Sequence, residues 1–253
     1  MAGALVIAAA CGGGGGDDED ARSDDTSSDA TTASTGADTA TTAVATPAAA
    51  DVSWVAQAQV PEVQVFGAAD GTGEPIHTLA NPNENGAPLV FLVQGAEQPT
   101  GEFIEVLLPV RPNGSTGWIR TSDVQLAQHN YRIRVELGAH RLVLTEGGEV
   151  TLEAPIGVGT QDTPTPGGTY YVKELLQPPD PAGAYGPFAY GLSGFSNELT
   201  SFAGGDGVIG IHGTNEPEAI GTDVSHGCIR LTNDVITQLA EVVPLGTPVE
   251  IVA

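Results

Sequence analysis

The chain has 253 residues, which is long enough for two modest domains or for one domain with a long tail. Its formal net charge of -24 at pH 7 argues against nucleic acid and anionic lipid as partners, because both are polyanions that an acidic surface repels. No basic patch interrupts this acidity, so we expect no nucleic-acid partner.

Residues 1–11 form a short apolar run that ends in small residues directly before Cys11, which resembles a bacterial lipoprotein signal. The run is too short to span a bilayer, which takes about 20 apolar residues. The resemblance implies cleavage before Cys11 and a lipid on its sulfur, so we expect an exported protein that the lipid holds at the membrane, facing the cell wall. An ordinary secretory signal, or none, is the alternative.

Residues 12–50 begin with glycines and acidic residues and continue in alanine, threonine, serine and aspartate, without an aromatic residue. Such a segment buries too little apolar surface to offset its ordering entropy, so it is predicted to be a disordered acidic linker. If Cys11 is anchored, this linker is a flexible tether with a typical span of roughly 35 Å.

Residues 51–126 read as short strands separated by turns, which predicts a small β-barrel. The predicted strands are residues 60–66, 89–93, 103–108 and 117–120, and the turns are 81–86 and 111–116. The sequence from Gly117 to Val124 resembles the end of a bacterial SH3-like domain. Trp118 either lines a groove for a wall peptide or sugar or packs in the core of that domain.

Residues 130–252 are predicted to form a second, mainly β domain that is sandwich-like or built on a closed sheet. Residues 132–137 alternate polar and apolar, and residues 141–145 and 150–156 flank Gly147 and Gly148, which is a hairpin signal. One helix is expected late in the chain. Thr232 or Asn233 can cap it, Pro244 to Gly246 end it, and residues 249–252 add a last strand. On its predicted apolar face lie Val235, Ile236, Leu239 and Val243.

The candidate site is carried by residues 208–214, Val-Ile-Gly-Ile-His-Gly-Thr, and residues 225–230, Ser-His-Gly-Cys-Ile-Arg. A free thiol has a pKa of about 8.5, and a nearby imidazole that takes its proton makes it a nucleophile at neutral pH. His212 and Cys228 are therefore the predicted base and nucleophile. The competing assignment makes His226 the base and leaves His212 a structural role.

A histidine, a variable loop and then Ser-His-Gly-Cys resemble the L,D-transpeptidase catalytic domain of the YkuD type. The stretch from Thr163 to Tyr170 and the sequence from Gly194 to Ser196 agree with this resemblance, which covers residues 130–252. It implies a mainly β catalytic domain and an enzyme of peptidoglycan synthesis and cell-wall organisation. Its substrates are the stem peptides of the wall, and neither a cofactor nor a metal is implied.

The resemblance also implies roles around the nucleophile. A backbone carbonyl, here that of Gly213, orients His212, although Asp206 and Asp223 are carboxylate alternatives. The backbone N–H groups of Gly227, Cys228 and Ile229 are expected to bind the tetrahedral oxyanion.

Four side chains are expected to shape the pocket or to contact the substrate. Ser225 and His226 belong to the turn of the nucleophile, and Arg230 either holds a substrate carboxylate or only braces its loop. Tyr190 is expected to reach the site as an oxyanion or substrate contact.

Several other interpretations of the same residues remain open. His212, His226 and Cys228 could bind zinc, but the chain has neither Cys-x-x-Cys nor His-x-x-x-His. A disulfide between Cys11 and Cys228 is a further alternative. The enzyme that the resemblance implies forms a thioester between Cys228 and a stem peptide and transfers the acyl group to an amine. The functional rivals are an L,D-carboxypeptidase that gives the same thioester to water, and a wall-binding protein without catalytic activity.

Overall fold

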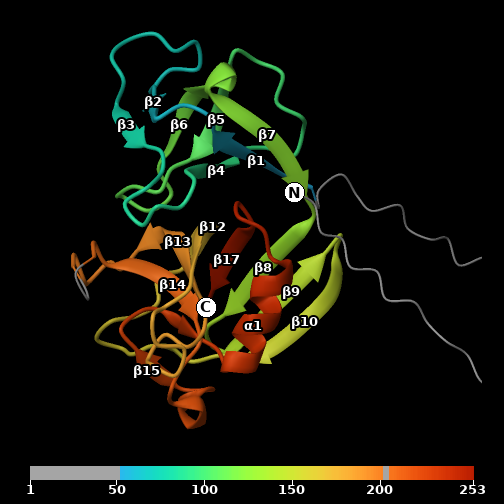
Figure 1. Cartoon of the computed structure of the whole chain (residues 1–253), viewed down its shortest axis with the longest axis vertical. Helices are drawn as coiled ribbons and strands as arrows, with labels where there is room; N and C mark the ends of the chain where they lie inside the picture. The colour runs from blue at the N-terminus through green and yellow to red at the C-terminus, as the bar shows by residue number, and fades with distance from the viewer. Residues whose placement is uncertain (1–51, 202–204) are drawn as a thin grey trace, which may run out of the picture. The chain divides into compact units, whose positions relative to one another are not determined.

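The computed structural model describes residues 52–201 and 205–253, which are coloured in Figure 1. The predicted signal with Cys11 and the predicted linker of residues 12–50 lie outside the described residues. Within the described part the fold is mainly β, with one α-helix and with 3-10 helices at Thr121–Asp123 and Pro217–Ala219. This confirms the mainly β prediction with one late helix. No helix in these described ranges is long and apolar enough to cross a membrane.

The first sheet has five antiparallel strands in the order β6-β5-β4-β1-β7. Its strands are β1 (Ser53–Ala58), β4 (Val90–Val93), β5 (Phe103–Leu107), β6 (Thr116–Arg120) and β7 (Val124–His129). A separate antiparallel pair is formed by β2 (Glu62–Val65) and β3 (His77–Ala80). Side chains alternate between core and surface along β2, which is the pattern of a strand with one buried face. Three predicted strands match β4, β5 and β6, whereas β1 was not predicted and residues 60–66 contain only the shorter β2.

The second sheet has eight strands in the order β10-β9-β8-β17-β12-β13-β14-β16. Its strands are β8 (Tyr131–Glu136), β9 (Arg141–Glu146), β10 (Glu149–Pro155), β12 (Gly168–Leu176), β13 (Ala189–Phe195), β14 (Val208–His212), β16 (Ile229–Arg230) and β17 (Pro248–Val252). Two of its pairs are parallel, β8 with β17 and β14 with β16. A short parallel pair, β11 (Val158–Gly159) and β15 (Asp223–Ser225), lies outside it. The second domain is thus built on one curled, eight-stranded sheet.

The predicted hairpin at Gly147 and Gly148 joins β9 to β10. Both glycines have positive φ, 58° and 85°, which other residues adopt only at a cost. The predicted helix is α1 (Asn233–Val242), with Thr232 at the cap position but without a side-chain capping bond.

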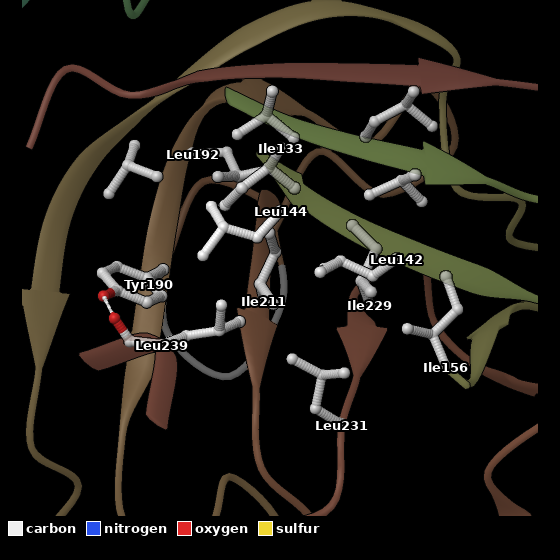
Figure 2. Close-up of a cluster of buried hydrophobic side chains, with 14 of the residues drawn as sticks. Ile133, Leu142, Leu144, Ile156, Tyr190, Leu192, Ile211, Ile229, Leu231 and Leu239 are labelled. Carbon is white, nitrogen blue, oxygen red and sulfur yellow. Dashed lines mark hydrogen bonds between the residues drawn. The ribbon is translucent and has the colours of Figure 1, made fainter. Parts of the chain in front are cut away.

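Helix α1 buries its apolar face against the second sheet. Ile236 and Leu239 are fully buried, and they join a core with side chains from β8, β9, β13 and β14 (Figure 2). Each such side chain contributes about 1.5–3 kcal/mol through removal from water. This core fixes β14 and β16, whose ends carry the candidate site.

The two sheets contact each other through β12. Tyr171 is fully buried among Val55, Val90 and Leu92, and its hydroxyl donates a hydrogen bond to Val90 O at 3.0 Å. Next to it on β12, Glu174 accepts hydrogen bonds from the side-chain amides of Asn83 and Asn85. These contacts tie the first sheet and its loops to a central strand of the second.

Candidate active site

A pocket of about 240 Å³ opens beside the ends of β14, β15 and β16. Its lining brings together the predicted residues His212, Ser225, His226, Cys228 and Arg230, and also Tyr185. His212 is the last residue of β14, and it is in register with Arg230 of the parallel strand β16. The two segments singled out in the sequence therefore meet at one site.

His212 is buried and makes one short hydrogen bond, from Nδ1 to Gly213 O at 2.6 Å. Since a carbonyl oxygen can only accept, Nδ1 carries the proton, and Nε2 of the neutral ring holds a lone pair. Burial lowers the pKa of His212 to about 4; the Gly213 carbonyl opposes this shift and Arg230 adds to it. His212 is therefore neutral at pH 7 and able to accept a proton at Nε2.

Gly213 thus makes the contact that was expected of it, while the carboxylate alternatives do not reach His212. Asp223 Oδ1 lies 2.8 Å from His140 Nε2. Asp206 is exposed, and its backbone carbonyl accepts a hydrogen bond from Arg111.

Cys228 lies in the turn between β15 and β16, and its thiol is free. The hydroxyl of Ser225 spans this turn, since it donates to Cys228 O at 2.6 Å and accepts the N–H of Gly227 at 3.1 Å. Gly227 has φ of 114°, a left-handed conformation that favours glycine. The turn is thereby fixed with the thiol at the pocket.

Burial raises the pKa of the Cys228 thiol, although the backbone of Gly210 and the charge of Arg230 act in the opposite direction. At neutral pH the resting site therefore holds a neutral thiol and a neutral imidazole, and not an ion pair.

Two of the expected oxyanion donors are placed differently. The Gly227 N–H is already donated to Ser225 Oγ, so its role is to hold the turn. Ile229 lies in β16 in register with Ile211, is fully buried, and is not among the residues that line the pocket. Of the three predicted donors, only the N–H of Cys228 is left as a candidate.

Arg230 lies at the pocket with its side chain 16% exposed. Its Nη1 donates to Glu216 Oε2 at 2.8 Å, whereas its buried Nε has no hydrogen-bond partner among the described residues. The side chain thus braces its loop through Glu216. His226 is exposed at the rim of the same pocket.

The expectation that Tyr190 reaches the site is wrong. Tyr190 is buried under α1, where its hydroxyl donates to Leu239 O at 2.9 Å (Figure 2). Val243 O lies 3.2 Å from the same hydroxyl. The tyrosine that lies at the pocket is Tyr185, whose ring centre is 4.8 Å from that of His212. Tyr185 comes from a loop rich in glycine and proline, where no periodic pattern marked it.

Among residues 52–201 and 205–253, no group of three or more His, Cys, Asp or Glu side chains could hold a metal ion. The pocket holds a thiol and a neutral imidazole that a backbone carbonyl orients.

Comparison with known proteins points in the same direction. Residues 130–251, just under half of the chain, match the family model of YkuD, the L,D-transpeptidase catalytic domain. YkuD of Bacillus subtilis (strain 168), a relative named as an L,D-transpeptidase, is 40% identical over 121 residues, which cover 48% of this chain and 65% of the relative. ErfK/SrfK of Salmonella typhimurium, also so named, is 32% identical over 203 residues, which cover 71% of this chain and 64% of the relative.

The chain therefore spans just under two thirds of the length of these relatives. Among solved structures, a crystal structure of an Enterococcus faecium L,D-transpeptidase mutant is 25% identical, covers 48% of this chain and 49% of its own, and has a TM-score of 0.38. The family model and the named relatives support a YkuD L,D-transpeptidase catalytic domain at residues 130–251.

Proposed function

We propose that the protein is a peptidoglycan L,D-transpeptidase that cross-links stem peptides through a thioester on Cys228. The observation that carries this proposal is the arrangement of the pocket. The thiol and a neutral His212 line the same cavity, and the hydrogen bond to Gly213 O leaves Nε2 of that histidine as the proton acceptor.

In the first step, His212 Nε2 takes the thiol proton as the sulfur attacks the carbonyl carbon before the terminal D-alanine of a tetrapeptide stem. The new S–C bond forms a tetrahedral oxyanion, which the N–H of Cys228 stabilises. The C–N bond then breaks, His212 returns the proton to the leaving amine, and D-alanine departs.

In the second step, an amine of a neighbouring stem attacks the thioester, with His212 again as the base. The S–C bond breaks, an amide forms, and the thiol regains its proton. Arg230, which lines the pocket, binds a carboxylate of the stem, since a guanidinium donates charge-assisted hydrogen bonds to a carboxylate. The thioester reacts with an amine acceptor faster than with water if the pocket excludes solvent and holds the amine in line.

Incubation with purified wall fragments, followed by mass spectrometry of the products, tests the proposal. Wild type should release D-alanine and give a dimer of stems, whereas Cys228→Ala should give neither product. A covalent adduct of the wild-type protein with the donor stem, absent in Cys228→Ala, should accumulate when no amine is supplied. A product mixture of shortened stems without dimer would move the assignment to the carboxypeptidase, and no product at all would favour the wall-binding alternative.

The proposed location is the outer face of the membrane, with a lipid on Cys11 and the acidic linker as a tether. The support is the lipoprotein-like sequence before Cys11, which lies outside the described residues. Cys11→Ala should move the protein from the membrane pellet to the soluble fraction and leave its activity on wall fragments unchanged. An unmodified Cys11 in the wild-type protein would contradict the anchoring.

A further inference from the structure

We propose that Arg111 and Asn113, which belong to the first sheet, are positioning residues of the pocket because they hold one of its walls in place. Both lie in the connection between β5 and β6, and they contact the segment between β13 and β14. The inference rests on the proposed function only where substrate is used to measure it.

The segment in question leads directly to the candidate base. It begins after Phe195 at the end of β13 and ends at Val208, where β14 starts toward His212. We call residues 196–201 and 205–207 the pocket wall, since Ser196, Leu199 and Gly207 line the pocket. The hydrogen bond from Ser196 N–H to Gly207 O at 2.8 Å closes the wall at its base, and Ser196 Oγ accepts the N–H of Leu199 at 3.0 Å. The described residues of the wall belong to none of the named strands, so contacts from outside the wall also fix its position.

Arg111 supplies contacts to both ends of the pocket wall. Its Nη1 donates to Ser196 O at 2.8 Å, and its Nη2 donates to Leu199 O at 3.1 Å and to Asp206 O at 2.9 Å. Three carbonyl oxygens thus converge on one guanidinium, whose planar and permanently charged fork suits several acceptors at once. Its carbon also lies 4.8 Å from the ring centre of Phe195, in a cation–π contact.

Asn113 fixes the start of the wall by a reciprocal pair of hydrogen bonds. Its side-chain amide donates to Phe195 O at 2.8 Å, and its side-chain oxygen accepts the N–H of Phe195 at 2.9 Å. The side chain therefore imitates a strand neighbour at the last residue of β13, where the sheet ladder ends.

The hydrogen bonds that hold the pocket wall are different from those that hold the reacting groups. The turn of Cys228 is held by Ser225, and His212 by Gly213, neither of which touches Arg111. Loss of Arg111 should thus loosen the surface on which the stem rests and leave the reacting groups as they are. The expected effect is weaker substrate binding with intact chemistry.

The experiment compares Arg111→Ala and the isosteric Asn113→Asp with Arg120→Ala in the full chain. Arg120 is a matched control because it also belongs to the first sheet, yet its cation–π contacts are to Phe66 and Phe103. In Arg111→Ala, KM for the donor stem should rise about tenfold, the value of one charged hydrogen bond, with kcat unchanged. Arg111→Lys should recover part of the loss, since an ammonium can serve some but not all of the three carbonyls.

Amide hydrogen exchange gives a readout that needs no substrate. Peptides that cover residues 195–201 should exchange faster in Arg111→Ala and Asn113→Asp than in wild type or Arg120→Ala, while alkylation of Cys228 by a small reagent keeps its rate. The inference would be overturned if these peptides exchange at the wild-type rate in both Arg111→Ala and Asn113→Asp, or if their exchange accelerates equally in Arg120→Ala. If the wild-type protein does not turn over stems, the proposed function fails, and hydrogen exchange alone decides whether Arg111 and Asn113 hold the wall.

Discussion

At the scale of single residues, the chemistry of the site depends on where the protons are. His212 donates a hydrogen bond from Nδ1–H to a carbonyl and has a pKa of about 4, and burial raises the pKa of Cys228. An imidazolium–thiolate pair would therefore be scarce in the resting site. The thiolate forms when the substrate arrives, with His212 as general base.

This proton distribution predicts the pH dependence of the site. As the pH falls through about 4, His212 becomes protonated and can no longer act as a base, so kcat/KM should fall there and not near the ordinary histidine value of 6.5. In the free protein, the rate of Cys228 alkylation should increase with pH above neutrality and should show no plateau at acidic pH. A rate that is already constant between about pH 5 and 7 would instead mean a preformed ion pair.

Tyr185 offers a second test at this scale. Its ring covers His212, and removal of the ring would let water reach the imidazole. Burial is the main cause of the lowered pKa of His212. In Tyr185→Ala, the acid limb of the pH profile, where kcat/KM falls, should therefore move from about pH 4 toward pH 6.5. Tyr185→Phe keeps the ring and should retain the wild-type limb. An acid limb that stays near pH 4 in Tyr185→Ala would show that the ring does not shield His212.

At the scale of elements, the turn of residues 225–228, which carries Cys228, depends on the hydroxyl of Ser225. Ser225 Oγ satisfies both the Gly227 N–H and the Cys228 carbonyl, so Ser225→Ala leaves two polar groups of the turn without their partner. We expect a loss of about 1–3 kcal/mol in the free energy of unfolding, and a larger proportional loss of kcat than of substrate binding.

Denaturant unfolding and steady-state kinetics measure these two effects. Ser225→Thr keeps the hydroxyl and should recover most of both. Thr121→Ala removes a hydroxyl that also bonds a backbone carbonyl, but in the 3-10 helix between β6 and β7, and it should leave kcat unchanged. A Ser225→Ala variant with wild-type kcat would show that the turn keeps its geometry without the hydroxyl.

The elements that neighbouring residues determine could be predicted from the sequence. The elements that depend on contacts with residues far away in the chain could not. The β9–β10 hairpin and helix α1 follow from Gly147, Gly148 and an apolar spacing that a few neighbouring residues decide. Strand β1 was missed because its sequence is rich in alanine and its burial does not alternate regularly. Cys228 and His212 stand out through a short motif, whereas Tyr185 is placed by the path of its loop. The wrong choice of Tyr190 had the same cause, since only the fold shows that α1 covers it.

At the scale of the whole molecule, the two sheets are joined at His129, the last residue of β7, and Tyr131, the first of β8. His129 Nδ1 accepts the N–H of Tyr131 at 3.3 Å, which leaves Nε2 buried without a partner among the described residues. Burial, and then the charge of Arg132, lower the pKa of His129 to about 4.

The lowered pKa of His129 predicts that the free energy of unfolding depends on pH. Between pH 6.5 and about 4 the unfolded chain binds a proton on His129 that the folded chain does not bind, so the free energy of unfolding decreases as the pH falls. With a discount for solvent screening of a partly exposed ring, the contribution is about 1–2 kcal/mol. Urea unfolding across this range should show a shallower decrease for His129→Gln than for wild type. Parallel curves for the two proteins would contradict this origin.

The position of β17 has a consequence for the order of events during synthesis. Residues 248–252 pair on one side with β8, which begins at Tyr131, and on the other with β12. A ribosome releases these residues more than a hundred positions after the strand that they complete, so the eight-stranded sheet cannot close before they have been made. Until β17 is available, β8 and β12 lack the strand that lies between them, and the thiol on the β15–β16 turn belongs to an incomplete sheet.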